Sequence, residues 1–159
     1  MAVSRIGYIS LYVTDLEAAR RHYVEVVGLQ QTDRDAAGRL YLQAADNQDH
    51  HCLVLTLAPH AGIDHVAFKV GEAEDLAEAR AAITERGMAV REVPAGDVLG
   101  AGAAIAFTLP SGQEMRLVHH LDKIGYAAGM RNPNPVPGHG KPGARVTHLD
   151  HLLLAGERP

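Results

Sequence analysis

The chain has 159 residues, of which 47% are hydrophobic and 21% charged, and its formal net charge at pH 7 is −4. That length supports one domain with a hydrophobic core, or two half-size modules that share one, and the composition is that of a globular protein. The acidic balance argues against nucleic acid, which requires a basic face, and no apolar run approaches the roughly 18 residues of a membrane span.

A period-two alternation opens the chain. Within residues 5–13, the apolar residues Ile9, Leu11 and Val13 alternate with their neighbours, which predicts a β-strand. The stretch from Thr14 to Glu17 has the S/T-x-x-E form of a capping box, so we expect a helix to begin there. Its apolar positions recur at helical spacing, and Gly28 provides a C-terminal stop.

Three short strands should complete this first module, near residues 29–33, 39–44 and 52–57. Leu55, in the last of them, is predicted to point into the core. Cys52 is the single cysteine of the chain and cannot form an internal disulfide. We expect it to be a small buried residue, and we expect the protein to reside in a reducing cytoplasm.

The second module repeats the same order from Ile63 onward. A strand over 65–70 precedes an alanine-rich helix over 72–86, which Gly87 ends. Further strands are predicted over 90–93, 104–109 and 114–118. The order βαβββ thus occurs twice. Such a unit has an apolar sheet face that it cannot bury alone, which is the physical reason for a second copy.

After residue 121 the character of the chain changes. Residues 122–145 contain five glycines and four prolines, which predicts an irregular linker. Residues 149–154 then repeat the opening of the second module, Ile63 to Phe68, and a fainter copy stands at the start of the chain. In this repeat Tyr8, His65 and His151 fall in register, so we expect 147–159 to be the first strand of a further domain that is cut short.

These motifs resemble a known superfamily. Tyr8 to Leu16 matches the first strand and Asp-Leu turn of the vicinal-oxygen-chelate superfamily, which includes glyoxalases, bleomycin-resistance proteins and extradiol dioxygenases. His22-Tyr23 with Gly28-Leu29 matches its helix-end pattern. Leu109 to Gln113 resembles the turn before the last strand in catechol 2,3-dioxygenases, and the linker followed by Leu149-Asp150-His151 is similar to the start of their catalytic C-terminal domain.

The resemblance implies an α+β fold in which two tandem βαβββ modules form a curved, half-barrel-like mixed sheet, followed by the irregular linker. The N-terminal domain would cover 1–121, with modules of about 1–60 and 61–121. The linker would cover 122–146, and 147–159 would be the first strand of a truncated C-terminal catalytic domain.

The resemblance also implies a divalent metal, Fe(II) or Mn(II), held by two histidines and one glutamate with open sites for catecholate and O₂. His151 would be the first of these ligands. In the N-terminal modules the corresponding positions hold Tyr8 instead of histidine and Arg116 instead of glutamate. Glu114 shares the side-chain parity of Arg116 but is displaced by about 7 Å along the strand.

We therefore expect no catalytic and no cofactor-binding residue within this chain, and no metal ligand other than His151. His65 is predicted to be a hydrogen-bonded strand histidine. The adjacent pairs His50-His51 and His119-His120 place their members on opposite faces of a strand, so neither pair should chelate one ion. We expect them to be solvated loop or edge residues.

Two hypotheses on function follow. In the first, the chain is the non-catalytic N-terminal part of a ring-cleaving extradiol dioxygenase. The full-length enzyme would act on a catechol and O₂ as a cytoplasmic homo-oligomer, and the present chain alone would be inactive. In the second, it is a stand-alone small-molecule binding or resistance protein of the same superfamily. The new strand copy that begins at residue 149 favours the first hypothesis.

Overall fold

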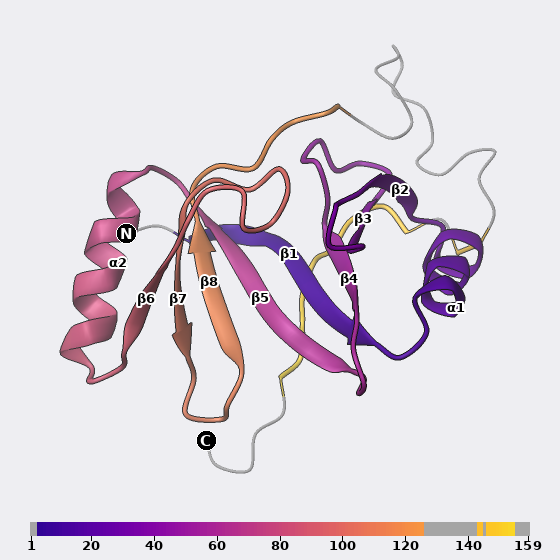
Figure 1. The fold of residues 1–159 in the computed structure, drawn as a ribbon. Helices are drawn as coiled ribbons and strands as arrows, with labels where there is room; N and C mark the ends of the chain where they lie inside the picture. The colour runs from indigo at the N-terminus through magenta and orange to yellow at the C-terminus, as the bar shows by residue number, and fades with distance from the viewer. Residues whose placement is uncertain (1–2, 126–142, 145, 155–159) are drawn as a thin grey trace. The chain divides into compact units, whose positions relative to one another are not determined.

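The computed structural model describes residues 3–125, 143–144 and 146–154 (Figure 1). The first half contains β1 (Val3–Val13), α1 (Leu16–Arg21), the π-helical turn η1 (His22–Val27), β2 (Gln30–Arg34), β3 (Leu40–Gln43) and β4 (Leu53–Leu57). The second half contains β5 (Gly62–Val70), α2 (Glu74–Glu85), β6 (Val90–Val93), β7 (Ala104–Thr108) and β8 (Glu114–Val118). The predicted βαβββ order is confirmed in both modules.

The chain forms two compact units that differ from these sequence modules. Unit 1 contains Met1–Ile9, Ile63–Asp122 and Asp150–Pro159, and unit 2 contains Ser10–Gly62 and Lys123–Leu149. Strand β1 contributes to both. The strand order is β1-β5-β8-β7-β6 in unit 1 and β2-β3-β4-β1 in unit 2. The α+β class is confirmed, and the curvature of the combined sheet stays a prediction.

In unit 1, β5 pairs with β8 in parallel, and β8-β7 and β7-β6 pair antiparallel. Helix α2 lies beside β6 (Figure 1). Its buried residues Ala79 and Ile83 pack in one cluster with Val70, Ile105 and Leu117 from the strands. This cluster gives the second module its own hydrophobic core.

In unit 2, β2-β3 and β3-β4 pair antiparallel, with an irregularity in register between Gln31 and Asp33. Leu55 is fully buried, as predicted, and Cys52 is only 4% exposed. Burial raises the pKa of the Cys52 thiol to about 11. At neutral pH this thiol is protonated and unreactive.

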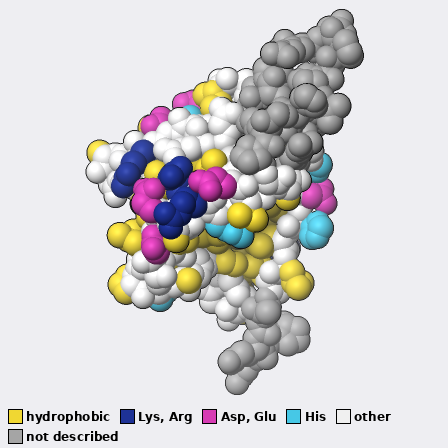
Figure 2. Space-filling model, turned by 90° about the vertical axis from the view of Figure 1, so that its right-hand side faces the viewer, with side chains coloured by type: hydrophobic (Ala, Val, Ile, Leu, Met, Phe, Trp, Pro, Cys, Tyr) yellow, Lys and Arg dark blue, Asp and Glu magenta, His cyan; other side chains and the backbone are white. Residues whose placement is uncertain are grey.

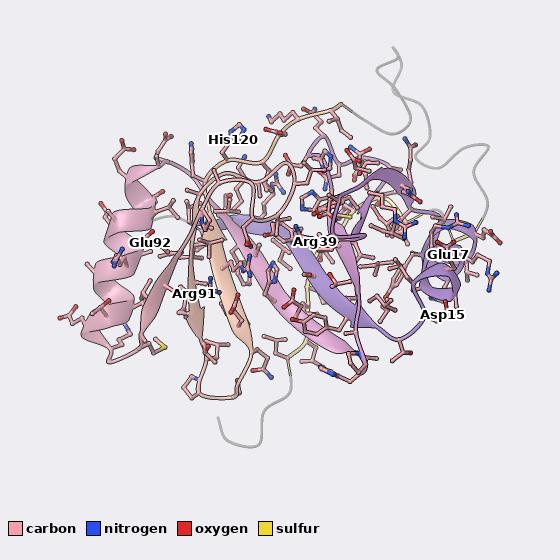
Figure 3. The ribbon with its side chains drawn as sticks, in the orientation of Figure 1. Asp15, Glu17, Arg39, Arg91, Glu92 and His120 are labelled. Atoms are coloured by element: carbon pink, nitrogen blue, oxygen red, sulfur yellow. The ribbon has the colours of Figure 1, made fainter. Side chains whose placement is uncertain are left out.

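The start of α1 corrects one prediction. The N-cap is Asp15 rather than Thr14, and its carboxylate accepts a hydrogen bond from the backbone N–H of Ala18 at 2.9 Å (Figure 3). Asp15 stands three residues before that amide, which is the reach of an N-cap side chain. The predicted stop at Gly28 is confirmed, because this residue adopts the left-handed conformation with φ 89° at the end of η1.

Of the strand predicted over 147–159, residues 147–154 are described and the structure assigns no strand to them, while 155–159 lie outside the described residues. A period-two segment becomes a strand only when another strand supplies hydrogen-bond partners. The predicted linker lies mostly outside the described residues, and the domain boundary near residue 146 stays a prediction. Among the described residues, no helix is both long and apolar enough to span a membrane.

Candidate functional site

Tyr8 on β1 and His65 on β5 lie side by side in unit 1, each 2% exposed. The Tyr8 hydroxyl is 3.3 Å from His65 Nε2, and the two rings meet edge to face with centroids 5.4 Å apart. On the other side of the imidazole, Nδ1 lies 3.0 Å from Asp64 Oδ2. The aspartate accepts the Nδ1 proton, so Nε2 can accept the hydrogen bond of the phenol.

Arg116 on β8 occupies the position where the resemblance implied a glutamate. It is 8% exposed. Its Nη1 donates to Asp97 Oδ2 at 2.7 Å, and its Nε donates to Glu114 Oε1 at 2.8 Å. Glu114 also accepts from Arg91 of β6, labelled in Figure 3, at 3.0 and 3.2 Å. The expected shared side-chain parity of Glu114 and Arg116 is confirmed by this contact.

The protonation of this network follows from burial and charge. Burial raises the pKa of Tyr8 to about 12, although the Arg116 guanidinium acts in the opposite direction. Burial disfavours the charged form of Arg116, but its bonds to Glu114 and Asp97 outweigh that effect and raise its pKa. The phenol is therefore neutral and the guanidinium charged over the physiological pH range.

In this arrangement the polar atoms of the network are hydrogen-bonded to one another. The lone pair of His65 Nε2 faces the Tyr8 hydroxyl, and the carboxylates of Glu114 and Asp97 are bonded to guanidinium groups. Within the part of the chain that the structure describes, no three His, Cys, Asp or Glu side chains are grouped as metal ligands. His65 is a hydrogen-bonded strand histidine, as predicted.

His151 has a different environment. Its side chain is 88% exposed, and its Nδ1 lies 3.0 Å from Asp150 Oδ2. An imidazole whose Nδ1–H is held by a carboxylate presents the lone pair of Nε2, which is the usual orientation of a metal-ligating histidine. The ligand role of His151 stays a prediction, but its local geometry fits that role.

The histidine pairs depart from the sequence prediction in part. His50 and His51 are buried, 8% and 0% exposed, with their Nδ1 atoms 3.0 Å apart. They lie outside the strands, so the rule of opposite strand faces does not apply. His120 is exposed and pairs with Asp122, as expected (Figure 3), whereas His119 is half-buried.

Tyr41 explains why the His50-His51 pair is buried. Its ring packs edge to face on both imidazoles, with centroid distances of 5.5 and 5.1 Å. Its hydroxyl donates to Asp35 Oδ2 at 2.7 Å, and Arg39 Nε donates to the same oxygen at 2.7 Å. Burial alone would raise the pKa of Asp35, but these bonds lower it.

Charges on the surface are mixed in sign. On the face in Figure 2, basic and acidic side chains lie beside one another and neither sign forms a separate patch. Ion pairs such as Arg20 Nε to Glu17 Oε2, at 2.9 Å, are of this kind. The described residues on this face therefore form no extended basic surface for a polyanion.

Comparison with known proteins shows which proteins the chain resembles. Residues 63–121 match the family described as catechol 2,3-dioxygenase-like N-terminal domain. Over 156 residues the chain is 34% identical to metapyrocatechase of Pseudomonas sp. (strain CF600), covering 98% of this chain and 50% of that protein. It is 27% identical over 152 residues to the manganese-dependent 2,3-dihydroxybiphenyl 1,2-dioxygenase of Geobacillus genomosp. 3, covering 93% of this chain and 48% of that protein.

The chain is also similar in structure to a dioxygenase whose structure has been solved. The 2,3-dioxygenase LapB from Pseudomonas sp. KL28 superimposes with a TM-score of 0.91 at 34% identity, covering 98% of this chain and 54% of that chain. The present chain spans about half the length of the curated relatives that it matches. Residues 63–121 therefore match the catechol 2,3-dioxygenase-like N-terminal domain, and the chain is similar along nearly its whole length to extradiol ring-cleaving dioxygenases.

Proposed function

We propose that this chain is the non-catalytic N-terminal part of an extradiol dioxygenase, which inserts O₂ into a catechol by meta-cleavage. The observation that carries the proposal is the closed network around Tyr8, His65 and Arg116. A ring-cleaving metal needs open coordination positions for both substrates. In the network of the N-terminal modules, the nitrogen and oxygen atoms that could bind such a metal are instead hydrogen-bonded to neighbouring side chains.

The metal would be held by the C-terminal domain, and His151 would supply its first ligand. The donor chemistry fits, because the imidazole of His151 is oriented by Asp150 and strongly exposed. Fe(II) and Mn(II) both accept such a nitrogen ligand, and one of the relatives carries manganese dependence in its name. The metal would bring catecholate and O₂ together and pass charge between them.

Within this chain, the contribution to catalysis would be structural. The two modules would form a scaffold for the catalytic half, while Asp150 would keep the Nδ1–H of His151 in place. We further propose that the full-length enzyme is a cytoplasmic homo-oligomer that acts on a catechol-type substrate. The names of the relatives, which refer to catechol and dihydroxybiphenyl cleavage, support this substrate class.

Activity of the isolated chain tests the proposal. The 159-residue chain is reconstituted anaerobically with Fe(II) or Mn(II), then given O₂ and catechol, 3-methylcatechol or 2,3-dihydroxybiphenyl, and ring opening is followed by absorbance. We expect no turnover above free metal. Metal-dependent turnover that disappears in His65→Gln would contradict the proposal, because it would place a working site in the N-terminal modules. His120→Gln, an exposed histidine paired with Asp122, is the matched control.

A further inference from the structure

The loop between β3 and β4, residues 44–52, holds two segments that are distant in sequence. The backbone N–H of Ile124 donates to Gln48 O at 2.9 Å. The backbone N–H of Asp46 donates to Thr147 O, also at 2.9 Å. One short loop of unit 2 is therefore the attachment point for both 123–125 and 146–148.

A buried side-chain amide is hydrogen-bonded to this loop. Gln43, at the end of β3, is 1% exposed. Its Nε2 lies 2.7 Å from Asn47 O, 3.0 Å from Asp49 O and 2.7 Å from Gly125 O. The same side chain thus joins the loop to the 123–125 segment. Any change in the conformation of the loop would be transmitted to that segment.

The His50-His51 pair forms the end of the same loop. An Nδ1-to-Nδ1 distance of 3.0 Å requires one nitrogen to donate a proton and the other to accept it. The contact therefore holds only one proton. Protonation of both nitrogens would turn two N–H groups toward each other and abolish the hydrogen bond.

The surroundings favour one positive charge but not two. Asp33 Oδ2 of β2 lies 3.6 Å from His50 Nε2 and can balance a charge on that ring. On β3, the Tyr41 hydroxyl is directed to Asp35, whose other partner is Arg39. The loop also contains the buried Asp49, and Asp46, whose Oδ2 lies 3.3 Å from His148 Nδ1 in the 146–148 segment. Cys52 follows as a neutral thiol. His51 is 0% exposed, so a second charge there is both repelled by His50 and removed from water.

We propose that the His50-His51 pair is an acid-sensitive latch for the β3-β4 loop. Protonation of both imidazoles breaks the Nδ1 contact, opens the loop and releases the 123–125 and 146–148 segments. With a single proton in the contact, the loop stays closed. The latch goes beyond the proposed function and does not depend on it, since it involves no metal and no substrate.

Hydrogen exchange at single amides tests the latch. Protection factors of the Asp46 and Ile124 amides are measured by NMR on the whole chain at about pH 7.5 and about pH 5.5, on either side of the ordinary histidine titration. Because protection factors are corrected for intrinsic exchange, they report the opening of the loop alone. We expect both to fall about tenfold or more at the lower pH, while the Leu117 amide in β8 changes less than about twofold.

Two variants assign the effect to the pair. His51→Phe keeps a ring against Tyr41 but cannot bind a proton, and should remove the pH dependence. His50→Gln provides the same test if the first variant does not fold. His120→Gln should behave like the wild type. The proposal is overturned by unchanged protection at the lower pH in the wild type, or by the same loss in both pair variants. It is also overturned if imidazole NMR shows both rings doubly protonated while protection is retained.

Discussion

Two Asp-His pairs of this chain have the same local bond and opposite surroundings. In each, the histidine Nδ1 lies 3.0 Å from the Oδ2 of the preceding aspartate, in Asp64-His65 and in Asp150-His151. The His65 side chain is 2% exposed and its Nε2 faces the Tyr8 hydroxyl, whereas the His151 side chain is 88% exposed. The aspartate orients the ring in both cases, and the neighbours of Nε2 decide whether it can bind a ligand.

The comparison also shows which charges surround the buried pair. The buried pair belongs to a network in which the Arg116 guanidinium provides the positive charge and binds two carboxylates. These bonds join β8 to the loop that contains Asp97. We infer that the network contributes to stability, while the exposed pair contributes to chemistry. The following predictions test that division, from the largest expected effect to the smallest.

Leu55→Ala calibrates the cost of losing a buried contact. Leu55 is 0% exposed in β4, so the substitution should lower the free energy of unfolding by about 2–5 kcal/mol through lost burial and a cavity. Urea denaturation measures the change. Leu57→Ala, two residues along the same strand at 62% exposure, should cost less than about 0.5 kcal/mol. Equal losses in the two variants would mean that the assigned burial of Leu55 is wrong.

Arg116→Met tests the network around the buried pair. Removal of the guanidinium leaves Glu114 and Asp97 without this partner, and should cost about 2–3 kcal/mol. This is less than for a fully buried ion pair, because the two carboxylate side chains are 29% and 42% exposed. Arg91→Met removes a more exposed partner of Glu114 and should cost less than about 1 kcal/mol. A loss below that level for Arg116→Met would exclude a structural role.

Tyr8→Phe should change stability mainly in alkali. The raised pKa of Tyr8, about 12 against 10.0, means that the folded state favours the neutral phenol. Its contribution is complete below pH 10 and is lost as the pH rises toward 12, by at most about 2–3 kcal/mol. Stability measured from pH 9 to about 12 should show this decline in the wild type and a smaller one in Tyr8→Phe. Tyr12→Phe is the control, and an identical decline in all three proteins would refute the assignment.

Substitution of the two histidines in this chain gives the smallest effects and the most direct contrast. His65→Ala leaves the Tyr8 hydroxyl without its acceptor and should cost about 1–3 kcal/mol. His151→Ala removes an exposed side chain and should cost less than about 0.5 kcal/mol. Thermal unfolding measures the loss of stability in the two variants. A larger loss for His151→Ala than for His65→Ala would contradict the structural role of the buried pair.

Much of the fold could be predicted from the sequence because its signals are local. The alternation in β1, the left-handed end at Gly28 and the repeated βαβββ order all depend on neighbouring residues. The strand predicted at residues 149–154 could not be settled in this way, since a strand also requires partners that no local pattern specifies.

The environment of the site depends on contacts that the sequence does not reveal. His50 and His51 were expected to be solvated loop or edge residues, but the ring of Tyr41 packs on both of them. The Arg116-to-Asp97 bond joins residues 19 positions apart, and no motif points to it. The recurrence of Asp-His was the usable signal, because it predicts equal orientation of the two rings.

The most direct test of the central claim is the metal content of the full-length protein that we propose. His151→Gln and His65→Gln are purified in parallel with the wild type, and bound iron and manganese are measured together with ring cleavage. The account predicts that His151→Gln loses both the metal and activity while its N-terminal modules stay folded, and that His65→Gln retains the metal. Retention of metal and activity by His151→Gln, or loss of the metal from a folded His65→Gln, would contradict the account.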